Sequence, residues 1–318
     1  MNSYQPTRIG AGMGLMLLAG FSFSGMDALL VKLALLTPDL SSPHRVFLRH
    51  LIGAPLAILV ALVILYRQKH VWVWRFLGWR IALARGVLGF LMAQFFFASL
   101  ERVGLGNAVL LHFTYPLVIT LVSWPLLGDR VGVWRAGAVL IGFAGVAVAT
   151  RGITATDLAV DVWGIIFALL GGVSFAFLML SMRLIPKEQS SLQISVYGIV
   201  VTLLCSSLFV VTLVPLPENW VAQALGARWE LLSIAVLGSA GVLCINQAYR
   251  FAPAIILGPL DYLVIIWAFL LEWWLFDHRP GQIVALGAAL IIVSGLLILW
   301  REQVRATPET ALKRTRSH

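Results

Sequence analysis

Charged residues are scarce in this 318-residue chain. They make up 12% of it, whereas hydrophobic residues make up 60% and the mean hydropathy is +0.93. A soluble domain of ordinary composition is roughly 45–50% apolar, so this chain carries more apolar surface than a water-soluble fold can bury. The composition therefore excludes a soluble globular protein and predicts a protein that lies in a membrane.

Motifs for metal binding, disulfide formation and nucleotide hydrolysis are also missing. The two cysteines, Cys205 and Cys244, fall in apolar runs without metal-ligand spacing or a disulfide pattern. No G-x-x-x-x-G-K-[ST] phosphate loop occurs, and no nucleophile, carboxylate pair or ligand cluster has the spacing that an intramembrane enzyme needs. The basic residues lie between apolar runs and form no nucleic-acid patch. We expect no enzyme activity, no cofactor, no metal and no nucleic-acid partner.

What the chain has instead is long apolar runs, each close to the ~20 residues that cross a bilayer. The expected helices cover residues 10–33, 44–65, 81–100, 106–126, 133–150, 162–184, 192–214, 231–249, 255–276 and 282–300. The connections between them leave no room for a soluble catalytic domain. The basic tail that follows the last run is expected to be disordered.

The two halves of the chain echo one another. Residues 17–24 read LLAGFSFS and residues 169–176 read LLGGVSFA, while residues 137–145 read GAVLIGFAG and residues 287–295 read GAALIIVSG. Because each unit has five runs, the second must enter the bilayer from the opposite face, as in many secondary transporters. We predict an all-α integral membrane protein of ten transmembrane helices: a first five-helix repeat (1–152), an inverted second repeat (153–300) and a basic cytoplasmic tail (301–318).

The loop charges predict the orientation. With the N-terminus inside, most arginines and lysines fall on the cytoplasmic side, and the other side receives Arg45, Arg102, Arg151, Arg228 and Arg279. Positive loops stay in the cytoplasm, so both termini are expected there. The protein is then a multi-pass protein of the cytoplasmic (inner) membrane of a bacterial cell.

Over residues 9 to 300 the chain resembles the drug/metabolite transporter superfamily, in its EamA-type branch. The resemblance rests on the paired motifs above, on VFLRHL and LARGVLGF, and on ASLERVGLGNAVLLHFTYPLVITLVSWPLLGDRV with its counterpart QAYRFAPAIILGPLDYLVIIWAFLLEWWLFDHRP. It implies a basket of ten helices around a central cavity, with alternating access and no ATP. Many relatives end the fourth and ninth spans with Gly-Glu, where this chain has Gly128-Asp129 and Phe276-Asp277, so those carboxylates inherit no role.

Ionisable residues inside spans are candidate site residues, because a charge in hydrocarbon costs at least ~3 kcal/mol. Asp27 and Asp261 lack an opposite charge one helical turn away. Asp27 either lines the cavity or pairs with an arginine of another helix, and Asp261 is expected to line the cavity. Glu272 is expected to be an interfacial charge.

Two arginines near helix ends, Arg49 and Arg85, could hold an anionic substrate group. A gate salt bridge or snorkelling explains them equally, and we favour such a gating or ion-pair role. His112, which shares a helix face with Tyr115, is either a proton site or a packing histidine.

Polar and aromatic side chains within the spans complete the substrate-binding candidates: Asp27, Gln94, His112, Tyr115, Asn246, Asp261, Tyr262 and Trp267. Bonds between helices explain residues such as Gln94 and Asn246 more often than a ligand does. For the aromatic cluster of residues 95–97 with Trp267, we favour packing against lipid over stacking on a substrate.

The function that these features favour is a secondary transporter for a small organic metabolite. Both signs of charge in the spans suit an amino acid, an amino-acid derivative or an amino-carboxylate metallophore, and we favour export. Proton coupling would use Asp27, Asp261 or His112. One alternative is uptake or exchange of an S-adenosylmethionine-like compound, to which the arginines and GPLDYLVII point by resemblance. Another alternative is a channel.

Overall fold

A computed structural model describes residues 9–67, 78–127, 133–156, 162–181, 184, 191–252 and 254–315, and within these ranges the regular elements are all helices. The helices are α1 (Ile9–Leu36), α2 (Ser42–Arg67), α3 (Trp79–Val103), α4 (Leu105–His112), α5 (Tyr115–Leu127), α6 (Val133–Thr156), α7 (Val162–Ser181), α8 (Ser191–Thr212), α9 (Trp220–Gly226), α10 (Arg228–Phe251), α11 (Ala254–Asp261), α12 (Leu263–Phe276) and α13 (Gln282–Thr315).

Eight helical stretches of 18 to 28 residues are long and apolar enough to cross a membrane. Two shorter apolar stretches, Leu263–Phe276 and Gln282–Ile298, follow them along the chain. The expected all-α membrane protein is therefore confirmed. The count of ten spans and the cytoplasmic position of the termini stay predictions.

Two of the expected spans are broken into two helices each. The fourth divides into α4 and α5 around Phe113 and Thr114, just before Pro116, and the ninth divides into α11 and α12 at Tyr262. Proline cannot donate to the carbonyl four residues earlier, so a helix that meets Pro116 loses a bond and opens. The breaks correspond, because α4 and α11 each have eight residues and His112 and Asp261 each end their helix.

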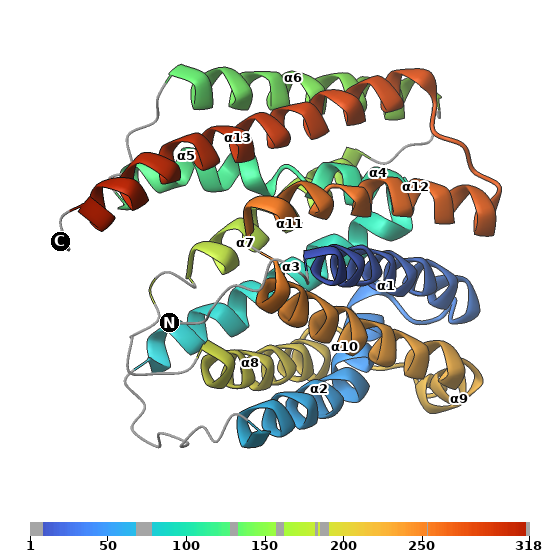
Figure 1. Cartoon of the computed structure of the whole chain (residues 1–318). Helices are drawn as coiled ribbons and strands as arrows, with labels where there is room; N and C mark the ends of the chain where they lie inside the picture. Colours follow the sequence, from blue (N-terminus) through green and yellow to red (C-terminus); the bar gives the residue numbers. More distant parts are fainter. Residues whose placement is uncertain are drawn as a thin grey trace.

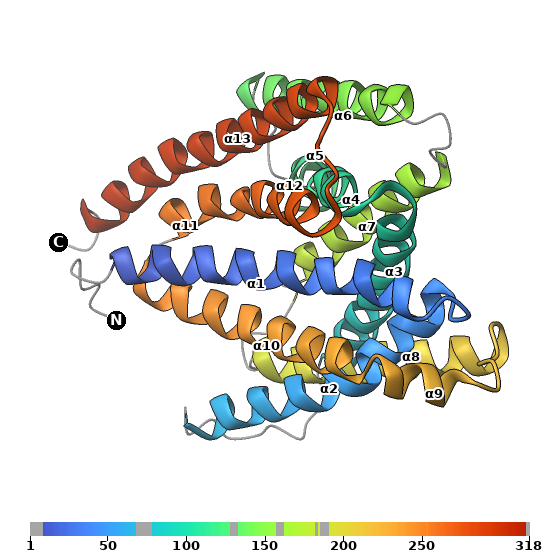
Figure 2. The ribbon, with the colours of Figure 1, turned by 90° about the vertical axis from the view of Figure 1, so that its right-hand side faces the viewer.

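Helices of the first half pack mainly against helices of the second half. α1 lies between α10 and the α11–α12 pair, and α6 runs beside α13 along one flank (Figure 2). Several of these contacts have a counterpart: α1 packs on α10 as α7 packs on α3, α2 packs on α10 as α8 packs on α3, and α1 packs on α12 as α7 packs on α5. The packing thus follows the internal duplication.

Glycines allow the closest of these helix contacts. A Cβ added at Gly287 in α13 would lie 2.6 Å from the Cβ and the backbone nitrogen of Ala149 in α6. At Gly295 an added Cβ would overlap the Tyr262 side chain. Because lipid gives no hydrophobic force between helices, such close backbone approach is the main source of packing energy.

The bundle has two ends. α1 begins and α13 ends at one of them, and α9 lies at the other (Figures 1 and 2). The segment between α8 and α10 contains the short helix α9. One expectation needs correction, because α13 continues to Thr315 where a disordered tail is expected from residue 301. Loops that carry Gly128 and Asp129 lie outside the described residues.

Candidate functional site

The two broken helices meet at their breaks, in the middle of the molecule. The Tyr115 hydroxyl, at the start of α5, donates a hydrogen bond of 2.8 Å to Asp261 Oδ2 at the end of α11. The rings of Phe113 and Tyr262, which occupy the breaks, have centroids 5.7 Å apart. Three predicted site residues, Tyr115, Asp261 and Tyr262, are therefore brought together from the two halves of the chain.

His112 ends α4 beside this junction and is surrounded by aromatic rings. Its ring centroid lies 4.8 Å from that of Phe96, 5.4 Å from that of Phe175 and 6.2 Å from that of Tyr115. His112 Nδ1 is buried and has no hydrogen-bond partner within the described part of the chain. The histidine therefore offers one unused polar atom in an apolar, aromatic surrounding.

Asp27 and Arg49 form an open pair of opposite charges. Asp27 is 7% exposed, and the charge of Arg49 in α2 acts on it. The described residues nevertheless give Asp27 no hydrogen bond and no direct ion pair. Arg49 instead lies over the Phe97 ring, 5.1 Å from its centroid, and its Nη2 donates to Met26 Sδ at 3.5 Å. Both charges are thus held without the close partner that a buried ion needs.

Two more predicted residues have buried donors that no described residue accepts, namely Gln94 Nε2 and Trp267 Nε1. Gln94 lies one helical turn before Phe97 on α3, the residue that supports Arg49. Trp267 packs edge-to-face on Phe21 with centroids 5.4 Å apart, and it approaches Gly20, which lies two turns before Asp27 on α1. Unused donors therefore flank the open charge pair on α3 and α12.

The lipid-facing position expected for the aromatic cluster is wrong for two of its rings. Phe96 and Phe97 are 8% and 2% exposed, because α3 packs against α7 and α8 and also contacts α1 and α2. Phe95 stacks on Phe167 with centroids 6.0 Å apart. Phe96 and Phe97 therefore lie in the interior, beside His112 and Arg49 respectively.

Arg85 lies apart from this group. Its Nη1 donates to the Leu178 carbonyl at 3.0 Å and to Ser181 Oγ at 2.8 Å, both in the last turn of α7. A cation at a helix C-terminus is favoured by the carbonyls that have no partner there. The side chain of Asn246 lies outside the described residues, and its role stays a prediction.

Three charged residues with structural consequences escaped the sequence reasoning. Arg45 and Glu101 form a 2.6 Å ion pair, although from the sequence Arg45 counts only among the loop charges and Glu101 is not singled out. Glu272 is 4% exposed, and its Oε2 accepts the Gly106 N–H at 2.8 Å at the start of α4. The G-L-G sequence at residues 104–106 was the available signal, since Gly104 adopts a φ of 82° and a side chain at either glycine would meet the carboxylate.

No group of three His, Cys, Asp or Glu side chains among the described residues could hold a metal ion. The arrangement is suited to binding a solute, because it presents a carboxylate, a guanidinium, polar atoms without partners and aromatic faces. Buried donors without acceptors cost about 1–3 kcal/mol each. A polar solute that supplied the missing partners would recover part of that free energy.

A family model, that of the EamA-like transporter family, matches residues 10–151 and again residues 162–300. A solved crystal structure superposes with a TM-score of 0.57 over 89% of this chain and 96% of the other, at 20% identity. At that identity the likeness shows the fold alone.

Curated proteins similar to this chain are named as transporters. One is an uncharacterized transporter of Helicobacter pylori, 27% identical over 90% of this chain and 94% of its own length. Another is a riboflavin transporter of Rhizobium johnstonii, 29% identical over 95% of both chains. A third, the S-adenosylmethionine uptake transporter of Rickettsia prowazekii, is 24% identical over 69% of this chain and 71% of its own.

Proposed function

We propose that this chain, which belongs to the EamA-like transporter family, is a secondary transporter that moves a small organic metabolite across the cytoplasmic membrane by alternating access. It is a multi-pass membrane protein and a transporter, not an enzyme. The observation that carries the proposal is the set of buried polar atoms without partners at Gln94, His112 and Trp267, on helices of both halves. A carrier needs such a site near the midplane, between its repeats.

The proposed architecture has ten spans in two inverted repeats, residues 1–152 and 153–300, with residues 301–318 on the cytoplasmic side. Its spans are α1, α2, α3, α4 with α5, α6, α7, α8, α10, α11 with α12, and α13. The paired helix contacts and the matching breaks at Phe113 and Tyr262 support the duplication. Loop charges support the cytoplasmic position of both termini.

The proposed substrate is zwitterionic: an amino acid, an amino-acid derivative or an amino-carboxylate metallophore. Asp27 and Arg49 support this class, since they are coupled electrostatically without a direct bond. An ammonium group beside Asp27 and a carboxylate on the Arg49 fork would give each buried charge a partner at once. The aromatic rings around His112 suit an apolar or planar remainder of the substrate.

A thermal-shift screen of the purified protein tests substrate class first. The panel contains amino acids, their derivatives, S-adenosylmethionine, riboflavin and an amino-carboxylate metallophore. Compounds that raise Tm are then tested by counterflow in proteoliposomes. Saturable counterflow is the expected result, whereas flux that does not saturate and shows no counterflow would identify a channel.

Uptake or exchange of an S-adenosylmethionine-like compound is the second candidate. The Rickettsia relative named for S-adenosylmethionine uptake favours it, and that molecule also carries an amino-carboxylate group. For the direction of transport, export remains our first proposal. Initial transport rates of the compound found in the screen, measured in vesicles of both orientations, distinguish export from uptake.

A further inference from the structure

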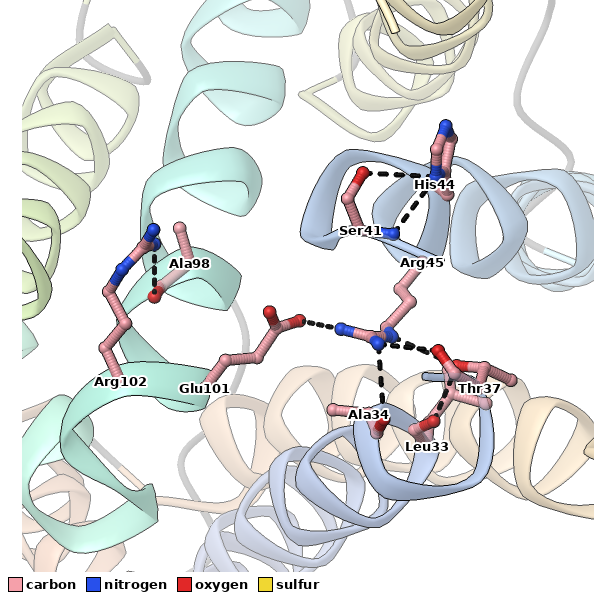
Figure 3. Close-up of polar contacts among 9 residues, drawn as sticks. All are labelled: Leu33, Ala34, Thr37, Ser41, His44, Arg45, Ala98, Glu101 and Arg102. Carbon is pink, nitrogen blue, oxygen red and sulfur yellow. Dashed lines mark hydrogen bonds and ion pairs between the residues drawn. The ribbon is translucent and has the colours of Figure 1, made fainter. Parts of the chain in front are cut away.

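Arg45 is a buried arginine whose guanidinium is bonded on all sides. It is 6% exposed. Its Nη1 pairs with Glu101 Oε1 at 2.6 Å, its Nε donates to Thr37 Oγ1 at 3.0 Å, and its Nη2 donates to the carbonyls of Thr37 at 2.7 Å and Ala34 at 3.2 Å (Figure 3). One side chain of α2 thus joins the end of α1 to the end of α3.

The bonds have a structural reason at α1. The last carbonyls of a helix have no partner inside the helix, and Arg45 satisfies those of Ala34 and Thr37. Glu101 lies in the last turn of α3, which ends at Val103. Three helices of the first half therefore close against one another at this end of the bundle, the end opposite to the start of α1.

Neighbouring residues tie the same end to the second half. His44 Nε2 lies 2.8 Å from the Val214 carbonyl in the connection after α8. Asp39 Oδ2 accepts hydrogen bonds from Asn219 at 2.9 Å and Gln223 at 2.8 Å, at the start of α9 and within it. Residues 39–45 are thus bonded to both halves of the chain at one end.

We propose that the Arg45–Glu101 pair is the latch of the outer gate, and that this structure has the latch closed. The proposal rests on the alternating-access function above and places this end on the extracytoplasmic side by the loop charges. Opening toward the outside moves the end of α3 away from α1 and α2, which separates Arg45 from Glu101. The attraction between the two charges is stronger while the gate excludes water than once water enters. The further hydrogen bonds of Arg45 offset the cost of burying its charge, so the pair stabilises the closed state selectively.

The test measures how fast a membrane-impermeant maleimide reaches a cysteine beneath the latch. Leu30→Cys is the reporter, because Leu30 is 3% exposed and lies one turn from Ala34 and one turn from Asp27 on α1. It is placed in a Cys205→Ala, Cys244→Ala background. Maleimides react with a thiol that solvent reaches, so labelling from outside reports the opening of this end.

With the latch intact we expect slow labelling of Leu30→Cys from outside. Glu101→Gln keeps the shape and removes the charge, and it should speed labelling about tenfold, a bias of ~1.4 kcal/mol between the closed and open states. Arg45→Lys keeps the charge but loses the fork, and a smaller increase in the labelling rate is expected.

The control is Glu230→Gln, which removes a 3.1 Å pair with the half-exposed Lys32 at the same end. Because water screens the half-exposed Lys32, this pair contributes little, so the labelling rate of Glu230→Gln should stay unchanged.

Equal labelling rates in the intact protein and in Glu101→Gln overturn the latch, as do equal increases in Glu101→Gln and the Glu230→Gln control. Fast labelling in the intact protein overturns it too. Failure of the transport proposal has a different signature, because a channel would label at Leu30→Cys from both sides at once. If Glu101→Gln fails to fold, Arg45→Lys keeps the test decisive, because it too should label faster than the protein with the latch intact.

Discussion

At the scale of single residues, Asp27 is the group whose removal discriminates a binding site from packing. Asp27 is buried, the charge of Arg49 acts on it, and no described residue forms a hydrogen bond with it. Asp27→Asn keeps the size and removes the charge. We expect normal insertion and substrate binding weaker by about ten- to a hundredfold, the loss of ~1.5–3 kcal/mol from a charged hydrogen bond. Isothermal titration with a hit from the screen measures it.

The control for that substitution is Glu218→Gln, since Glu218 is an exposed carboxylate on the connection between α8 and α9. It should bind like the unsubstituted protein. If Asp27→Asn also binds normally, Asp27 is a structural counter-charge for Arg49 and the substrate group lies elsewhere.

Candidate site residues could be predicted from the sequence where a charged residue interrupts an apolar run. Asp27, Arg49 and Asp261 were found for that reason. Arg45, Glu101 and Glu272 were not, because a charge near the end of a run looks the same in sequence whether it faces water or a neighbouring helix. Only the packing of α1, α3 and α4 shows that these three have protein partners.

At the scale of helices, the α6–α13 pair depends on small residues. Gly287→Ala places a Cβ 2.6 Å from Ala149, including its backbone, which cannot rotate away. We expect destabilisation by about 1–3 kcal/mol, as for overpacked cores, seen as a lower Tm. Gly137→Ala in α6 is the matched control, because an added Cβ there meets nothing within 4 Å. Equal Tm values for the two variants would show that α6 and α13 are not closely packed in the membrane.

The positions of the helices could be predicted from the apolar runs, whereas the breaks within the fourth and ninth spans could not. Pro116 marked the region of the first break, but the exact division after His112 depends on the turn at Thr114, whose N–H bonds to Leu111. At the second break Pro259 lies inside α11, and the helix ends two residues later at Asp261. The two breaks are joined by the contact between Phe113 and Tyr262. These residues are 149 positions apart, so no local sequence pattern could have predicted that they meet.

At the scale of the whole molecule, the ten-span topology assigns each connection to one side. We expect a cysteine at Arg80, an exposed position in the first turn of α3, to label only from the cytoplasm. Cysteines at Glu218 and Asp277, in the connections before α9 and after α12, should label only from outside. Impermeant reagents on intact cells and on inverted vesicles make the measurement. Labelling of Arg80→Cys and Glu218→Cys from the same side contradicts the inverted arrangement.

Proton coupling is also a property of the whole carrier, because a group must change its charge between the inward-facing and outward-facing states. Asp27, Asp261 and His112 are the candidates, and two of them end the corresponding helices α4 and α11. If one of them carries the proton, an imposed pH gradient should drive accumulation of substrate in proteoliposomes. Replacing that residue with a neutral one should abolish the response and leave exchange intact, since exchange returns substrate without releasing the proton. Equal flux with and without the gradient would make the carrier a uniporter or an exchanger, and these side chains would then serve binding alone.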